Sequence, residues 1–229
     1  PSSVLGMQPS EDGARWLFVD GNERYAAGPV PENPVGWGHD ALAFYPFEEP
    51  FESVFASEVE GGNVSLLDYD RVVWALGRES TAEVTLTASE QSAIEAFLAQ
   101  GGRLLISGSE LGYDLVGQGD AASQAFAKGV LGVDYVADDA ATTLTRPGAK
   151  SPAGGGLARF SRLGRHEVAF PDVLAPASGG ASCLRYAKGT GGDACVVTDL
   201  AAGGRVIVLG VPLESVDDPT LVHGLLQSL

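Results

Sequence analysis

Four short apolar runs along the chain have the pattern of strands that are buried on both faces of a sheet. They lie at 16–19, 71–76, 103–107 and 205–210, and each is nearly continuous in large apolar residues. Runs of this kind are typical of the central strands of parallel sheets, because both faces of such strands are covered. We therefore expect these four segments to form the centre of one sheet.

The clearest helix signal lies between the second and third of these runs. Thr87 can accept a hydrogen bond from the Glu90 amide while the Glu90 side chain reaches back, and an apolar stripe follows. Further helices are expected over 51–59 and 121–130 and from Pro219 onward. A strand, a helix and a second strand in this order form a right-handed unit with parallel strands, so the pattern predicts an α/β fold rather than a β-sandwich.

Shorter segments of β-type sequence fill much of the second half of the chain. They lie at 135–136, 142–145, 184–186 and 195–198, between turn signals. Because the last apolar run follows them, we interpret them as a β-rich annex, within residues 115–200, of a single domain that spans residues 1–229.

The two cysteines, Cys183 and Cys195, flank a turn signal at 189–192. A hairpin centred there brings them to neighbouring strands, where Cβ atoms ~4.5–5.5 Å apart allow a disulfide after modest adjustment. The alternative is a pair of buried free thiols. A metal site is not expected, because neither cysteine has a His or a second Cys at ligand spacing.

The formal net charge of −16 comes from acidic residues scattered along the whole chain. A field of this sign repels phosphate backbones and anionic headgroups, and no cluster of Lys and Arg interleaved with aromatic residues offsets it. No run approaches the ~18 apolar residues that a membrane span needs. We therefore expect neither nucleic acid nor a membrane as a partner.

Polar residues that could carry chemistry gather where the apolar runs end. In an open α/β sheet, ligands bind beyond the carboxyl ends of the strands. This position nominates Asp20, Arg78, Glu79, Ser107, Ser109, Glu110 and Glu214. The alternative interpretation is that these groups cap helices and bind loop amides. No phosphate-binding glycine motif follows Asp20, so no nucleotide or flavin cofactor is expected.

The order of these segments resembles that of class I glutamine amidotransferase-like proteins. Gly77 and Arg78 match the family's oxyanion loop, and residues 107–112 (Ser-Gly-Ser-Glu-Leu-Gly) match its Gly-x-Cys-x-Gly nucleophile elbow, with no Cys and one extra residue. Residues 210–214 (Gly-Val-Pro-Leu-Glu) stand where the family has His-Pro-Glu, so the acid is present and the imidazole is absent. The resemblance implies a flavodoxin-like α/β fold, with a mostly parallel central sheet flanked by helices, without glutaminase chemistry.

A narrower resemblance runs from residues 68–74 through 77–80 and the capped helix to 104–112. These segments are similar to C-terminal domains of large secreted bacterial proteins of the xanthan-lyase-like and golvesin-associated kind. The resemblance implies a secreted or cell-surface location near an extracellular polymer, and no established chemistry.

A serine hydroxyl is a poor nucleophile unless a neighbouring base takes its proton. The three histidines, His39, His166 and His223, lie outside these motifs. We therefore expect a non-catalytic accessory or binding domain, whose partner is a neighbouring module of the same polypeptide or an extracellular polysaccharide. Four loop aromatics suit sugar stacking, although packing under the loop explains them equally well: Trp37, Phe44, Tyr45 and Phe47.

The competing hypothesis is a hydrolase that acts on an extracellular polymer. Ser109 is then the nucleophile, or Glu79, Glu110 and Glu214 form an acid/base cluster, since paired carboxylates suffice for glycoside hydrolysis. Clustered carboxyls with raised pKa values favour this hypothesis, whereas individually satisfied acids favour the binding domain.

Overall fold

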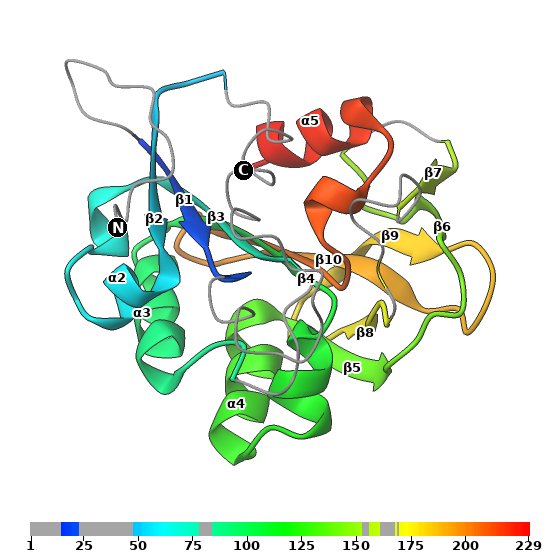
Figure 1. Ribbon diagram of the computed structural model, residues 1–229, viewed down its shortest axis with the longest axis horizontal. Coiled ribbons are helices and arrows are strands. Elements are labelled where there is room, and N and C mark those ends of the chain that lie inside the picture. The colour runs from blue at the N-terminus through cyan, green and yellow to red at the C-terminus, as the bar shows by residue number, and fades with distance from the viewer. Residues whose placement is uncertain (1–14, 23–47, 78–83, 153–155, 161–167, 169) are drawn as a thin grey trace, which may run out of the picture.

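The computed structural model describes residues 15–22, 48–77, 84–152, 156–160, 168 and 170–229. Within these residues the chain forms one mixed sheet of 11 strands (Figure 1). The strands are β1 (Trp16–Asp20), β2 (Phe51–Phe55), β3 (Arg71–Gly77), β4 (Arg103–Gly108), β5 (Val133–Ala137), β6 (Leu144–Pro147), β7 (Ala158–Arg159), β8 (Val173–Pro176), β9 (Ala181–Tyr186), β10 (Asp193–Asp199) and β11 (Arg205–Leu209). The strand order is β2-β1-β3-β4-β11-β10-β9-β6-β7, and β8 pairs with both β10 and β5.

One half of the sheet is parallel. Strands β2, β1, β3, β4 and β11 run in the same direction, and the last four coincide with the four apolar runs of the sequence. Almost every position of these four strands is buried, as expected for strands that are covered on both faces. These strand predictions are confirmed.

The other half of the sheet is antiparallel, and the predicted fold class is wrong for this reason. β10 pairs antiparallel with β11 and with β9, and β6 and β7 continue the sheet in alternating directions. β5 and β8 pair antiparallel with each other, and β8 also pairs antiparallel with β10. The domain is therefore a large, mostly β, mixed sheet with a few short helices, and not a mostly parallel flavodoxin-like sheet flanked by helices.

The physical reason lies in the connection between β10 and β11. A tight turn joins them, closed by hydrogen bonds from the Leu200 amide to the Gly204 carbonyl (2.9 Å) and from the Gly203 amide to the Leu200 carbonyl (3.0 Å). Parallel neighbours need a crossover of roughly a dozen residues or more, so a turn this short makes the pair antiparallel. The β-type segments of the second half therefore extend the main sheet outward from β11 instead of forming an annex on it.

Short helices cover parts of both faces of the sheet. They are α2 (Ala56–Glu60), α3 (Ala88–Ala99), α4 (Ala121–Phe126) and α5 (Pro219–Gln227), together with the 3-10 turns η2 (Leu66–Asp68) and η5 (Leu213–Ser215) and the π-helical turns η3 (Tyr113–Gly117) and η4 (Ala127–Leu131). Figure 1 shows α5 on the opposite side of the sheet from α3 and α4. Leu221 and Leu225 of α5 belong to one apolar cluster and Ile94 and Phe97 of α3 to the other, so the core consists of two layers. None of the described helices is long and apolar enough to cross a membrane.

Helix α3 begins as the sequence predicts. Thr87 Oγ1 accepts a hydrogen bond from the Glu90 amide at 3.4 Å, and Glu90 Oε2 accepts one from the Thr87 amide at 2.7 Å. This reciprocal pair satisfies two amides that the first helical turn leaves without partners. The predicted helices at 121–130 and from Pro219 are also observed, as α4 followed by η4 and as α5.

The segment at 51–59 differs from its predicted helix. Its first half is β2, which pairs parallel with β1, and helix α2 begins only at Ala56. Aromatic and β-branched side chains at Phe51, Val54 and Phe55 suit a strand once a partner strand is adjacent. The tertiary pairing decides the conformation here, and the local pattern does not contain that information.

The predicted hairpin that carries the two cysteines is confirmed as β9 and β10. Cys195 pairs in register with Leu184, the neighbour of Cys183, and the register is irregular on both sides of Cys195. Both cysteines are buried free thiols. Burial, followed by the neighbouring Cys183, raises the pKa of the Cys195 thiol well above its ordinary value. The structure thus corresponds to the free-thiol alternative.

Candidate functional site at the turn after β4

The carboxyl ends of the parallel strands meet at one edge of the sheet. In register, Asp20 lies beside Ala75, Ala75 beside Ser107, and Ser107 beside Leu209. In-register side chains point to the same face and neighbouring strands are ~4.8 Å apart, so the Asp20 and Ser107 Cα atoms lie roughly 10 Å apart across that face. Both residues are buried.

Glu214 reaches the same end of the sheet from η5, which follows β11 and lies beside β3. It is also buried, and Asp20, Ser107 and Glu214 are all engaged by other groups of the chain. The structure therefore gathers three of the predicted site residues at one end of the sheet. Arg78 and Glu79 lie outside the described residues.

Ser109 lies in a tight turn that begins where β4 ends. Gly108 has no room for a side chain, because a Cβ there would lie 2.7 Å from the Leu76 Cβ. The Ser109 amide donates a hydrogen bond to the Gly77 carbonyl at 3.3 Å. The turn is thus fixed against the end of β3, with Ser109 only 5% exposed.

The Ser109 hydroxyl forms no hydrogen bond with an imidazole in the part of the chain that the structure describes. His223 lies on α5, where its Nδ1 is 3.8 Å from Glu48 Oε1. His39 and His166 lie outside the described residues, as do the loop aromatics from Trp37 to Phe47. Within the described residues, Ser109 therefore has no histidine base to activate it.

Asp172, which the sequence did not single out, binds the turn from the segment before β8. Its Oδ2 accepts a hydrogen bond from the Gly112 amide at 2.6 Å, and its Oδ1 accepts one from the Tyr113 amide at 3.3 Å. The Asp172 amide donates to the Gly210 carbonyl at 2.9 Å, and the Tyr186 hydroxyl donates to the Asp172 carbonyl at 2.8 Å. The carboxyl group is completely buried and fills the amide site at the start of η3.

Glu110 in this turn and Asp172, which binds it, have carboxyl groups that hold protons more tightly than free carboxyls do. Burial, followed by repulsion from Asp138 and Asp114, raises the pKa of Glu110 from 4.5 to about 7. Burial also raises the pKa of Asp172 well above its ordinary value, partly opposed by the hydrogen bond from the Gly112 amide. The turn is therefore less negative at neutral pH than its composition indicates.

Two tyrosines border this turn. Tyr113 of η3 and Tyr135 of β5 pack edge to face with their ring centroids 5.9 Å apart, and both are half-buried. Burial, followed by Asp138, raises the pKa of Tyr135 above its ordinary value. Partly exposed aromatic rings beside polar groups are typical of surfaces that bind sugars or peptides.

The arrangement can bind a ligand through hydrogen bonds and aromatic contacts. Within the described residues, no group of three or more His, Cys, Asp or Glu side chains has the geometry of a metal site. Asp172 and Tyr135 carry no short-range sequence signal, because they come to the turn only through the pairing of β5, β8 and β10, whereas Tyr113 follows Ser109 by four residues in the chain. Among the predicted site residues, Glu110 has a raised pKa.

Comparison with known proteins gives structural neighbours only. No family model and no curated protein matches the chain. The structure is similar to the mmIFT52 N-terminal domain, with a TM-score of 0.50 and 14% sequence identity over 93% of this chain and 94% of that one. It is also similar to a putative ThuA-like protein from Bacteroides uniformis, with a TM-score of 0.54 and 11% identity over 96% of this chain and 91% of that one. At these identities the similarity is one of fold.

The resemblance to class I glutamine amidotransferase-like proteins, and to the secreted xanthan-lyase-like group within them, is wrong as an assignment. The structural neighbours of this chain include the two proteins just named, and the sheet is mixed and mostly β rather than parallel and flavodoxin-like. The apolar runs carried that resemblance, and buried strands of many folds share such runs.

Proposed function

We propose that this chain is a non-catalytic binding domain, and that its binding surface is the turn after β4 with the bordering rings of Tyr113 and Tyr135. The observation that carries the proposal is the position of Asp172. Its carboxyl group takes the amides of Gly112 and Tyr113. Amides at such a helix start would otherwise be available to stabilise the developing charge of a reacting substrate.

The partner that we propose is a neighbouring module of a larger polypeptide or an extracellular polysaccharide. One structural neighbour, the mmIFT52 N-terminal domain, is part of a longer protein. Half-buried tyrosine rings next to hydroxyl and carboxyl groups supply the stacking and hydrogen bonds that neutral sugars use. A secreted or cell-surface location belongs to the same proposal.

A hydrolase is the second candidate, and one observation favours it. Glu110 follows Ser109 directly, and its pKa of about 7 is the value that suits a general acid or base at neutral pH. The missing imidazole partner of Ser109 among the described residues weighs against it.

Two assays separate these candidates. Hydrolysis of p-nitrophenyl acetate, a peptide anilide and p-nitrophenyl glycosides is measured for the wild type, Ser109→Ala, Glu110→Gln and the control Ser92→Ala, which changes an exposed serine of α3. We expect no turnover above the background rate in any of them. Turnover that Ser109→Ala or Glu110→Gln removes, and Ser92→Ala keeps, overturns the proposal in favour of the hydrolase.

Binding is tested by affinity electrophoresis in gels that contain neutral polysaccharides such as xylan or dextran. We expect retardation of the wild type and its loss in Tyr113→Ser, with Leu157→Ser as a matched control because Leu157 is 67% exposed before β7. Retardation that is unchanged in Tyr113→Ser places the binding surface elsewhere and contradicts the proposal.

A further inference from the structure

A row of arginines lies at the amino edge of the parallel strands, opposite the turn after β4. Arg71, Arg103 and Arg205 are the first residues of β3, β4 and β11 and are register partners, and Arg15 directly precedes β1. The row holds four of the 14 Lys and Arg residues of a chain whose net charge is −16. Positive charge is therefore concentrated at this edge.

The guanidinium groups are held in place by neighbouring groups. Arg71 lies over the Trp16 ring at 5.0 Å, and its Nη1 donates to Glu49 Oε1 at 2.9 Å. The main-chain oxygen of Leu229 accepts hydrogen bonds from Arg71 Nε at 3.3 Å and from Arg103 Nη1 at 2.7 Å. Fixed guanidinium groups lose little conformational entropy when a ligand binds them.

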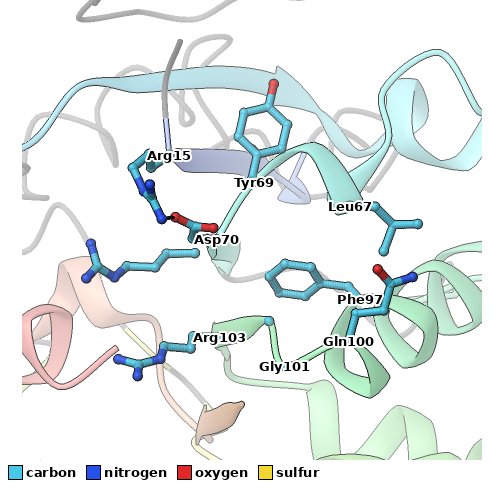
Figure 2. A pocket seen from close by; sticks show the side chains of 10 residues that line it. Arg15, Leu67, Tyr69, Asp70, Phe97, Gln100, Gly101 and Arg103 are labelled. Carbon is cyan, nitrogen blue, oxygen red and sulfur yellow. Dashed lines mark ion pairs between the residues drawn. The ribbon is translucent and has the colours of Figure 1, made fainter. Parts of the chain in front are cut away.

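A pocket of about 390 Å³ opens between this row and the end of α3. Figure 2 shows Arg15 and Asp70 on one side of it, Phe97 and Gln100 on the other, and Arg103 below. Among the described residues, three arginines and a single carboxylate, Asp70, line it. Because Arg15 pairs with Asp70 and Arg71 pairs with Glu49, the positive charge that remains at the pocket within the described residues is that of Arg103.

Each of these arginines keeps donors for a ligand. An arginine has five N–H donors. In Arg103, the described residues supply an acceptor to one nitrogen only, Nη1. Arg15 pairs with Asp70 through Nη2 and is 71% exposed. The Phe97 and Leu98 carbonyls at the end of α3 accept hydrogen bonds from the amides of Gln100, Gly101 and Gly102, which reduces the repulsion of an anion by these two carbonyls.

We propose that this pocket binds an oxyanion group, a carboxylate, sulfate or phosphate, on a compact ligand such as an acidic sugar. Planar guanidinium groups match the paired oxygens of such groups. A volume of about 390 Å³ is at the small end of ligand pockets, which range over ~300–1,000 Å³. The Phe97 ring and Leu67 give the pocket an apolar wall for the body of the ligand. The site is independent of the turn at Ser109.

The test is calorimetric titration of the intact chain with D-galacturonate, D-galactose and inorganic phosphate at about 0.15 M salt. We expect saturable binding of galacturonate and phosphate that weakens as salt rises, and none of galactose, which has the same ring without the carboxylate. Arg15→Gln and Arg103→Gln each weaken binding about tenfold, the effect of one charge-assisted hydrogen bond. Binding of phosphate without galacturonate supports a site for free oxyanions; binding of both supports a sugar acid.

The control is Arg146→Gln, which removes the same charge from an exposed position of β6 outside the pocket. Arg103→Gln also removes a hydrogen bond to Leu229, so circular dichroism checks its fold, whereas Arg15 has only an exposed ion pair and its variant keeps the fold. The proposal is overturned if neither anion binds saturably, if galactose binds as well as galacturonate, or if Arg15→Gln and Arg103→Gln bind as the control does.

Discussion

Asp172 Oδ2 accepts a hydrogen bond of 2.6 Å from the amide of Gly112, a residue 60 positions away in the chain. The bond joins the segment before β8 to the start of η3, the turn that follows Ser109. A Cβ on Gly112 would lie 2.9 Å from a Leu174 methyl and 3.1 Å from Asp172 Oδ2, so the two segments touch. The antiparallel half of the sheet thereby fixes the geometry of the candidate site in the parallel half.

Replacement of Asp172 tests this link. Asp172→Ala leaves the amides of Gly112 and Tyr113 buried without an acceptor, so we expect the free energy of unfolding to fall by about 2–4 kcal/mol. Asp172→Asn keeps a side-chain acceptor and should cost less than half as much. Urea denaturation measures both, and hydrogen exchange at Gly112 and Tyr113 should accelerate in the alanine variant.

Asp68→Ala is the control for the Asp172 variants, because Asp68 is exposed on η2. It should change the free energy of unfolding by less than about 0.5 kcal/mol. Equal stability of Asp172→Ala and Asp68→Ala would show that Asp172 does not hold the turn.

Local signals in the sequence were sufficient for the elements but not for their arrangement. The capping box at Thr87 and the four buried strands need only neighbouring residues, and they were predicted correctly. The direction of β10 depends on a short turn next to β11, and β2 exists only because β1 pairs with it, so a pattern read along the chain misses both. The fold class was wrong because it took most of the sheet to be parallel and flanked by helices, whereas the sheet is mixed and mostly β.

The candidate site was predictable in part for the same reason. Ser107 lies near the end of a buried strand and Ser109 and Glu110 follow it, which placed all three at the edge where ligands bind. Asp172 reaches that edge through strand pairing, which no spacing in the sequence reveals. The arginine row did have a signal in the sequence, since β3, β4 and β11 each begin with an arginine. That these arginines form a row depends on the common register of the three strands.

Glu110 makes the stability of the fold depend on pH. Its pKa is raised from 4.5 to about 7, so the folded state keeps a proton that the unfolded chain releases. The free energy of unfolding should therefore fall as pH rises from about 4.5 to about 7 and level off above, by about 1–2 kcal/mol once solvent screening of this half-buried group is included. Urea denaturation at pH 5 and pH 8 measures the difference. Glu110→Gln should reduce the measured drop by that amount, and the exposed control Glu95→Gln should leave it unchanged; the remainder belongs to Asp172, whose pKa is also raised. A drop in Glu110→Gln as large as that of the wild type would assign none of it to Glu110.

The cysteine pair should be chemically silent in the folded protein. Both thiols are buried, and the pKa of Cys195 is raised well above its ordinary value, so little thiolate is present to react. With Ellman's reagent we expect less than about a tenth of a thiol per chain before unfolding and two after it. Intact mass spectrometry after alkylation in denaturant should show two modified cysteines. A mass lower by two hydrogens, with no alkylation, would show instead that the disulfide forms.

Arg205 should stabilise the end of α5 without contributing to the pocket. Its Nη1 donates to the Ser228 carbonyl at 2.7 Å and its Nε to Asp199 Oδ1 at 2.7 Å, and it does not line the pocket. Because the guanidinium group is partly exposed, Arg205→Gln should lower the free energy of unfolding by only about 0.5–1.5 kcal/mol, and by less at 1 M NaCl. Hydrogen exchange at the end of α5 should accelerate, while binding of galacturonate or phosphate stays within about twofold of wild type. A loss of anion binding as large as that in Arg103→Gln would show that the anion site and the end of α5 form one unit.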